Sequence, residues 1–336
     1  MTRSPGDAEV WIGQELHDLI EELYPICRSI TGDGVRETLA LLSRTAPIEV
    51  HEVPSGTEVL DWTVPDEWNV RDAYVADAEG RRVIDFRRSN LHLVNYSTPV
   101  RASMTLDELR PHLHTLPEQP DLVPYRTTYY ERTWGFCLSQ HELDELRPET
   151  YEVVIDATLE PGSLTYGEVV VEGSSDELVL VSAHCCHPSL CDDNLSGLVV
   201  AAELAGRMSS GPPPRRTHCF VFAPGTIGAI TWLARNRVRA SRIVAGLTLT
   251  CLGDDRPFTY KRTLDGSTAI DRAAAHVLGH RDDGSGLIDF FPNGYDERQY
   301  NSPGFRAPVG SMMRGRHGLF PEYHTSGDDL EFERPE

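Results

Sequence analysis

The sequence lacks any long apolar run. No stretch of its 336 residues approaches the ~20 consecutive apolar residues that a membrane-spanning helix needs. Its first ten residues are polar and acidic, without the apolar core of a secretion signal. Positive charge is also scarce, because 31 lysine and arginine residues stand against 52 aspartate and glutamate residues, giving a formal net charge of −21. This balance argues against nucleic acid and against an anionic membrane surface as partners.

Cysteine is scarce too, with seven residues in the chain. Three of them, Cys185, Cys186 and Cys191, crowd one short segment and the others are scattered, which is not the spacing of a disulfide framework. We therefore expect a reducing, cytoplasmic environment. The remaining composition is ordinary for a globular protein, with 40% hydrophobic and 25% charged residues. The length suits one large domain or two modest ones.

The residue pattern divides the chain into three ranges. Residues 1–47 contain apolar residues at helical spacing, at 15–23 and 32–42. Residues 48–132 hold short alternating segments broken by proline and glycine, which predicts a small inserted β-rich module. Residues 133–336 alternate strands with helices. This alternation predicts an α/β fold of three layers, with a mostly parallel mixed sheet flanked by helices, to which the N-terminal helices also belong. The strands are expected at 152–156, 167–171, 178–182, 217–223 and 243–252, and the helices at 197–205, 227–236 and 269–278.

The strongest chemical signal is the segment LVLVSAHCCHPSLCDDNLSG, residues 178–197. Its valine-rich start is too short for an amphipathic helix and predicts a buried central strand. The strand ends at His184, followed by His187 in a loop that Pro188 interrupts, and Asp193 comes six residues later. Ligands collect beyond the carboxyl ends of such strands, and imidazole with carboxylate is a donor mix that catalytic zinc accepts. The segment therefore predicts a metal site.

A second segment, PEYHTSGDD at residues 321–329, supplies a late histidine, His324. With the strand-end His184 and the Asp193-x-x-Ser-Gly loop, residues 151–330 resemble the co-catalytic zinc aminopeptidase family, whose clan includes glutamate carboxypeptidase II and glutaminyl cyclase. The whole chain also resembles an aminopeptidase-like group with a β module inside the peptidase domain, through YPICRSITG at 24–32 and GYDERQY at 294–300. The resemblance implies a zinc-peptidase-like fold and metal ligands at His184, Asp193 and His324.

Four positions depart from the pattern of that clan. Gly225 stands where the clan has its general base, Thr226 where it has a metal-binding glutamate, Thr250 near its third carboxylate ligand, and Cys186 where an aspartate follows the first histidine. Two divalent ions about 3.5–4 Å apart need several carboxylates to offset their repulsion. One zinc ion is therefore predicted in preference to two, with an open position for water.

The sequence offers several candidates for the other metal ligands and for the catalytic groups. His187 is an alternative ligand, as are the thiols of the segment, and soft thiolates favour zinc. A base must lie within reach of the proton that it takes. Its candidates are Glu322, Asp296 and Glu297, and the clan's use of an aspartate in a comparable loop favours Asp296 for positioning. The substrate-binding candidates are Tyr295, Arg298 and Arg314, since either arginine can pair with a substrate carboxylate.

These features predict a zinc-dependent hydrolase of the aminopeptidase type, in which metal-activated water cleaves an amide or peptide bond. The substrate is expected to be a small molecule or peptide with an amine group, and a homo-oligomer is left open. Two alternatives stand beside this prediction. One is a catalytically inactive binding module of the same fold, which the missing Glu-Glu pair favours. The other is a single-zinc enzyme that either cyclises an amine onto an amide or catalyses amide transfer.

Overall fold

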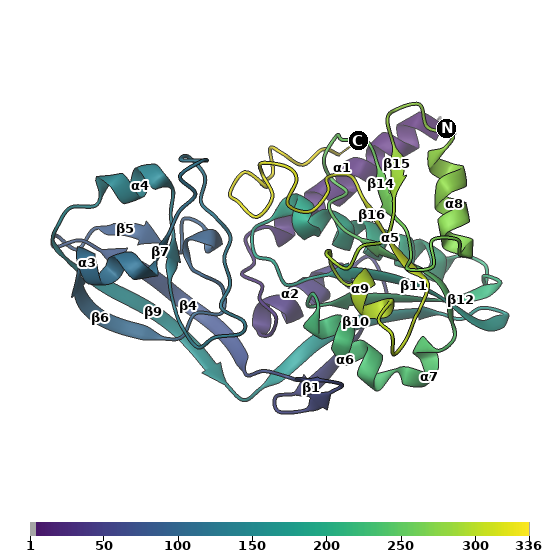
Figure 1. Ribbon diagram of the computed structural model, residues 1–336, viewed down its shortest axis with the longest axis horizontal. Coiled ribbons are helices and arrows are strands. Elements are labelled where there is room, and N and C mark those ends of the chain that lie inside the picture. Colours follow the sequence, from purple (N-terminus) through teal and green to yellow (C-terminus); the bar gives the residue numbers. More distant parts are fainter. Residues whose placement is uncertain (1–4, 336) are drawn as a thin grey trace.

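The computed structural model describes residues 5–335, which form a large α/β body and a smaller β-rich body (Figure 1). The large body is built on one eight-stranded mixed sheet. Its strands, in spatial order, are β1 (Glu49–Pro54), β10 (Ser163–Val171), β12 (Arg216–Ala223), β11 (Ser175–His184), β13 (Ile243–Leu249), β16 (Val309–Met313), β14 (Thr259–Lys261) and β15 (Gly286–Ile288). The central strand β11 pairs in parallel with both β12 and β13, so its carboxyl end meets theirs at one edge.

The central strand is buried on both faces, which explains its continuous apolar sequence. Val181 packs with residues of α1 (Pro5–Leu23), α2 (Asp33–Leu42) and α5 (Gly197–Ser210). Its neighbour Leu180 faces the other way. There it packs with α6 (Ile227–Arg235), next to the short helices α7 (Arg237–Ala240) and α9 (Glu297–Tyr300). Helix α8 (Ala269–Leu278) covers β13, β15 and β16. The expected three-layer fold is therefore confirmed.

The smaller body is an antiparallel sheet in the order β5 (Arg82–Asp85), β4 (Glu67–Ala76), β9 (Thr150–Glu160) and β6 (Val100–Thr105). Its apolar side chains, such as Trp68, Tyr151 and Ile155, form its core. The short elements around it are β2 (Glu58–Val59), β3 (Trp62–Thr63), β7 (Leu113–His114), β8 (Phe136–Cys137), α3 (Leu106–Leu109), α4 (Gln140–Glu145) and the 3-10 turns Asn90–His92 and Arg110–His112.

The strand pairing cuts across the three sequence ranges that composition suggested. Strand β1 lies within 48–132 but pairs with β10 of the large sheet. Strand β9 lies within 133–336 but pairs with β4 and β6 of the small sheet. The division at 47 and 132 stays a prediction about domains. Each of the helices and strands expected individually is present at its place in the chain.

No helix within residues 5–335 is both long and apolar enough to cross a membrane.

Candidate metal centre

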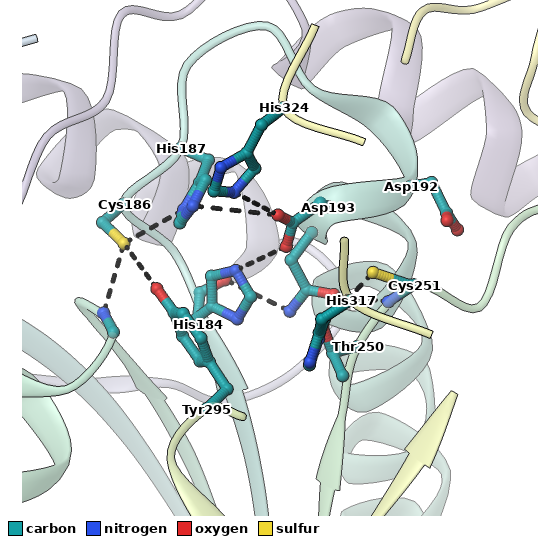
Figure 2. A network of polar contacts seen from close by, with 12 residues as sticks. His184, Cys186, His187, Asp192, Asp193, Thr250, Cys251, Tyr295, His317 and His324 are labelled. Carbon is teal, nitrogen blue, oxygen red and sulfur yellow. Dashed lines mark hydrogen bonds and ion pairs between the residues drawn. The ribbon is translucent and has the colours of Figure 1, made fainter. Parts of the chain in front are cut away.

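Four predicted donors meet just beyond the end of β11 (Figure 2). The carboxylate of Asp193 lies at their centre. Its Oδ1 atom is 3.0 Å from Nε2 of His184 and its Oδ2 atom is 2.9 Å from Nε2 of His324. Nε2 of His187 is 3.8 Å from the same Oδ2. The donor atoms of His184, His187 and Asp193 all lie within 4.8 Å of one another.

The donor set fits a divalent ion. His184, His187 and Asp193 are buried, whereas the His324 side chain is 35% exposed. Both oxygens of Asp193 and the Nε2 atoms of His184 and His324 are buried without a hydrogen bond of adequate geometry to any described residue. Buried polar atoms are normally satisfied, so such a cluster indicates an ion. Two zinc ligands at bond lengths of ~2.0–2.2 Å lie roughly 3.3 Å apart in tetrahedral geometry, close to the separations found here.

The electrostatics of the cluster suit ligands in their metal-binding protonation states. Burial opposes the ionisation of Asp193, but the surrounding imidazoles of His187, His184 and His324 hold its pKa well below the usual value. Burial also lowers the pKa of His187 well below its usual value, against the attraction of the Asp193 carboxylate. An ionised carboxylate beside a neutral imidazole is the form in which these side chains bind zinc.

A buried carboxylate from the C-terminal segment fixes the loop that carries Asp193. Asp328 accepts the backbone N–H groups of Asp192 at 2.6 Å and of Asp193 at 2.9 Å. Asn194 donates to the carbonyl of Leu249 at 3.1 Å, which ties the loop to the end of β13. The His-Thr-x-x-Asp context of His324 carried the signal for this role, because Asp328 ends that motif.

Cys186 and Gly225, two of the positions that depart from the clan pattern, belong to one network of contacts. The thiol of Cys186 lies 3.2 Å from Nδ1 of His187, 3.2 Å from the backbone N–H of Gly225 and 3.5 Å from the hydroxyl of Tyr295 (Figure 2). The Tyr295 ring lies 4.0 Å from the ring of His184. A Cβ atom at residue 225 would lie 1.8 Å from the Tyr295 hydroxyl. The tyrosine therefore occupies the space that a side chain at 225 would need, which no sequence pattern indicated.

The three candidate bases have different surroundings. Glu297 is fully buried and bound at 2.7 Å by Nζ of Lys261. Asp296 is buried and accepts the backbone N–H of Thr226 at 2.6 Å. Burial raises the pKa of Asp296 to about 6, and the nearby His184 opposes the rise. Glu322 is partly exposed, two residues before His324 on the same loop. Asp296 is thus a buried carboxylate whose pKa is influenced by a donor histidine.

Neither candidate arginine has a described contact with the four donors. The Arg298 side chain is exposed on α9. The guanidinium of Arg314 lies 4.4 Å from the Phe258 ring centroid and donates to the carbonyl of Arg256 at 3.1 Å. Thr250, at the expected position of a third carboxylate ligand, instead contacts Nε2 of His317 at 3.1 Å. His317 is a neighbour of the centre that the sequence did not single out.

Comparisons with known proteins agree with this architecture. The sequence model of a domain of unknown function, DUF4910, matches residues 17–336. A Clostridium acetobutylicum protein, named for polysaccharide biosynthesis and an aminopeptidase-like domain, is 51% identical over 318 residues, which are 95% of this chain and 73% of that protein.

Two solved structures place the fold. A C. acetobutylicum crystal structure named as a peptidase has a TM-score of 0.96 and 49% identity, covering 98% of this chain and 78% of that one. A Bacillus subtilis zinc aminopeptidase has a TM-score of 0.65 and 13% identity, covering 96% and 90%. The second likeness concerns the fold alone. The aminopeptidase-like resemblance inferred from the sequence is confirmed.

Proposed function

This chain belongs to the family of the domain of unknown function DUF4910, and we propose that it is a zinc-dependent hydrolase of amide bonds. Its aminopeptidase-like relatives support a hydrolase-like enzyme at the family level. The single observation that carries the proposal is the convergence of the Nε2 atoms of His184 and His324 to within 3.0 Å of the buried carboxylate of Asp193. Such a set has no packing role, since burying polar and charged groups costs free energy.

The proposed centre holds one zinc ion. His184, Asp193 and His324 are its ligands, and His187 is the alternative fourth donor. When bound, a zinc ion polarises a substrate carbonyl and activates water for attack. Three protein donors leave a position open for this chemistry, whereas four would give a closed, structural site. The partial exposure of His324 is consistent with a centre that is open on that side.

The remaining chemistry falls to groups of the chain. A proton must be accepted and later delivered to the leaving amine. We assign this role to Asp296, since it is buried and near enough to His184 for that imidazole to lower its pKa, whereas Glu297 is already engaged by Lys261. Glu322 is the alternative. We propose a small amide or peptide with an amine group as the substrate, and a reducing, cytoplasmic environment because all seven cysteines, each in the described part of the chain, are free thiols.

A second candidate function has one specific observation in its favour. The Tyr295 hydroxyl fills the space beside Gly225, where a phenol rather than a carboxylate faces the donors. A phenol has an ordinary pKa of ~10 and is a poor general base at neutral pH. This favours either a binding module or single-zinc chemistry without activation of water, such as cyclisation of an amine onto an amide.

Metal analysis and a reporter assay test the proposal together. We expect protein purified without added zinc to contain close to one zinc ion per chain, and to release product from aminoacyl p-nitroanilides. His324→Ala should abolish release, whereas His280→Ala, which changes an exposed histidine that follows α8, should not. Zero zinc in folded protein would contradict the metal centre and favour the binding module. Tight zinc without reporter cleavage would favour the cyclising chemistry.

The proton-transfer assignment has its own test. Asp296→Asn should lower kcat by about 10²–10⁴-fold if Asp296 carries the proton. Glu322→Gln is the matched variant on the other candidate and should leave kcat within a few-fold. The reverse ranking would move the role to Glu322. Zinc content, measured for both variants, separates loss of chemistry from loss of the ion.

A further inference from the structure

A cavity of ≈ 440 Å³ is separated from the donor cluster by aromatic side chains that contact the donors. Tyr295, His317 and Tyr323 line it on that side. The Tyr295 ring lies 4.0 Å from the ring of His184, and the Tyr323 ring stacks on His324 at 4.0 Å. A molecule in the cavity therefore lies one aromatic ring away from the proposed ligands. Its volume is within the ~300–1,000 Å³ of small-molecule sites.

Part of the cavity wall is apolar and exposed. Phe291 and Leu319 line it, and their side chains are 38% and 67% exposed. Ile288 and Met313 contribute further apolar surface to the wall. Single exposed apolar side chains are unremarkable, but two at the rim of one cavity beside a reactive centre offer surface that an apolar ligand would cover. This apolar part of the wall suits the hydrocarbon part of a substrate.

The charge of the cavity is opposite to that of the protein. Lys261 and Arg316 are among its lining residues, and none of the described lining residues is acidic, although the chain carries a net charge of −21. The charge of Lys261 is balanced by Glu297 at 2.7 Å. The exposed guanidinium of Arg316 has neither hydrogen bond nor ion pair with a residue that the structure describes. One uncompensated positive charge thus remains at the cavity.

We propose that this cavity binds a carboxylate on an apolar or aromatic body, as part of the amide substrate, and that Arg316 receives the carboxylate. The planar guanidinium matches a carboxylate through two parallel hydrogen bonds. The inference rests on the proposed hydrolase function and names its substrate class. It assigns carboxylate recognition to Arg316 and not to Arg298 or Arg314, neither of which lines the cavity.

Binding of two probes without an amide bond tests the inference independently of turnover. The probes are 3-phenylpropanoate and its neutral analogue 3-phenylpropan-1-ol, each titrated calorimetrically into zinc-loaded and into chelator-treated protein. We expect the carboxylate to bind about fivefold more tightly than the alcohol in both forms. Arg316→Gln should remove this preference and leave alcohol binding unchanged. Arg298→Gln, a matched exposed arginine, should keep the preference.

Each other outcome overturns the inference. Equal affinity of the two probes for the unmodified chain, or no binding of either probe, would remove the carboxylate site. A preference that persists in Arg316→Gln but disappears on chelation would assign the carboxylate to the metal and not to Arg316. None of these results touches the proposed hydrolysis, which the reporter and zinc content decide. Conversely, a chain that binds no zinc but discriminates between the probes through Arg316 would refute the hydrolase and retain the anion site.

Discussion

A methyl group added at Gly225 tests whether Tyr295 is what shapes the centre. The new Cβ atom would lie 1.8 Å from the tyrosine hydroxyl oxygen and 2.2 Å from the ring carbon that bears it. Ordinary contacts are about 3.5 Å, so the ring must retreat by roughly 1.5 Å, toward the cavity that it lines. Overpacking of this kind costs about 1–3 kcal/mol. The displaced ring also loses its position against His184, so zinc affinity should fall.

A double-mutant cycle measures this effect. We expect Gly225→Ala to lower the free energy of unfolding by about 1–3 kcal/mol in the parent chain but by less than about 0.5 kcal/mol in a Tyr295→Ala background. Denaturant unfolding of the zinc-free protein gives these values, and competition with a chromophoric chelator gives the zinc affinity. Gly304→Ala is the matched control, because nothing lies within 4 Å of its added Cβ. Equal costs in both backgrounds would refute the steric argument.

Three further predictions concern groups around the centre. Cys186→Ala tests whether His187 serves as the fourth donor: in that case zinc binding should weaken by about 10–100-fold because His187 loses the partner of its second nitrogen, with partial recovery in Cys186→Ser, whereas an unchanged affinity would exclude His187 from the centre; Cys137→Ala, at a buried thiol outside the contacts of Cys186, is the control. Asp328→Ala leaves two backbone N–H groups of the metal-binding loop unsatisfied and should cost about 2–4 kcal/mol in thermal or urea unfolding; a change below about 0.5 kcal/mol would contradict this. Burial raises the pKa of Glu333 to about 8, so the folded state binds more protons than the unfolded state between about pH 4.5 and 8, and stability falls across this range. Glu333→Gln removes that dependence, so the stability of the variant relative to the parent should be greater at pH 9 than at pH 5. If urea unfolding gave the same difference between variant and parent at both pH values, the assignment would be contradicted.

The parts of the fold that follow from local pattern were predictable. The valine-rich segment before His184 indicated a buried strand, because it is too short and too rich in β-branched residues for an amphipathic helix. Parallel pairing then brings the carboxyl ends of β11 and β13 together, which places Asn194 and the Asp193 loop beside Leu249. The imidazoles and the carboxylate were found by residue type at the ends of these strands. Their meeting with His324 came from the family resemblance rather than from spacing.

The parts that sequence reasoning missed are contacts between distant segments. Glu297 was a candidate base, but its pairing with Lys261 joins residues 36 positions apart through α9 and β14. Tyr295 packs against Gly225 across 70 residues, and a lone glycine carries no signal of what fills its missing side chain. The sequence does not distinguish Arg316 from Arg298 and Arg314, because only the folded structure shows which of the three lines the cavity. Such contacts depend on how loops close over the sheet edge, which local propensity does not determine.

The charge around the donors supports the proposal of one ion in preference to two. Neutral imidazoles add no charge, so Asp193 alone offsets the ion within the donor set. The guanidinium of Arg28 is fully buried nearby, donates to the backbone carbonyl of His187 at 2.8 Å and adds a positive charge behind the cluster. With Asp193 as the only carboxylate, one divalent ion leaves the donor set at +1, whereas two would leave it at +3 beside that arginine. At ~4 Å two such ions repel strongly even at an effective dielectric constant of ~20. This balance supports the proposed single ion, and a zinc content near two per chain would show that carboxylates beyond Asp193 reach the centre.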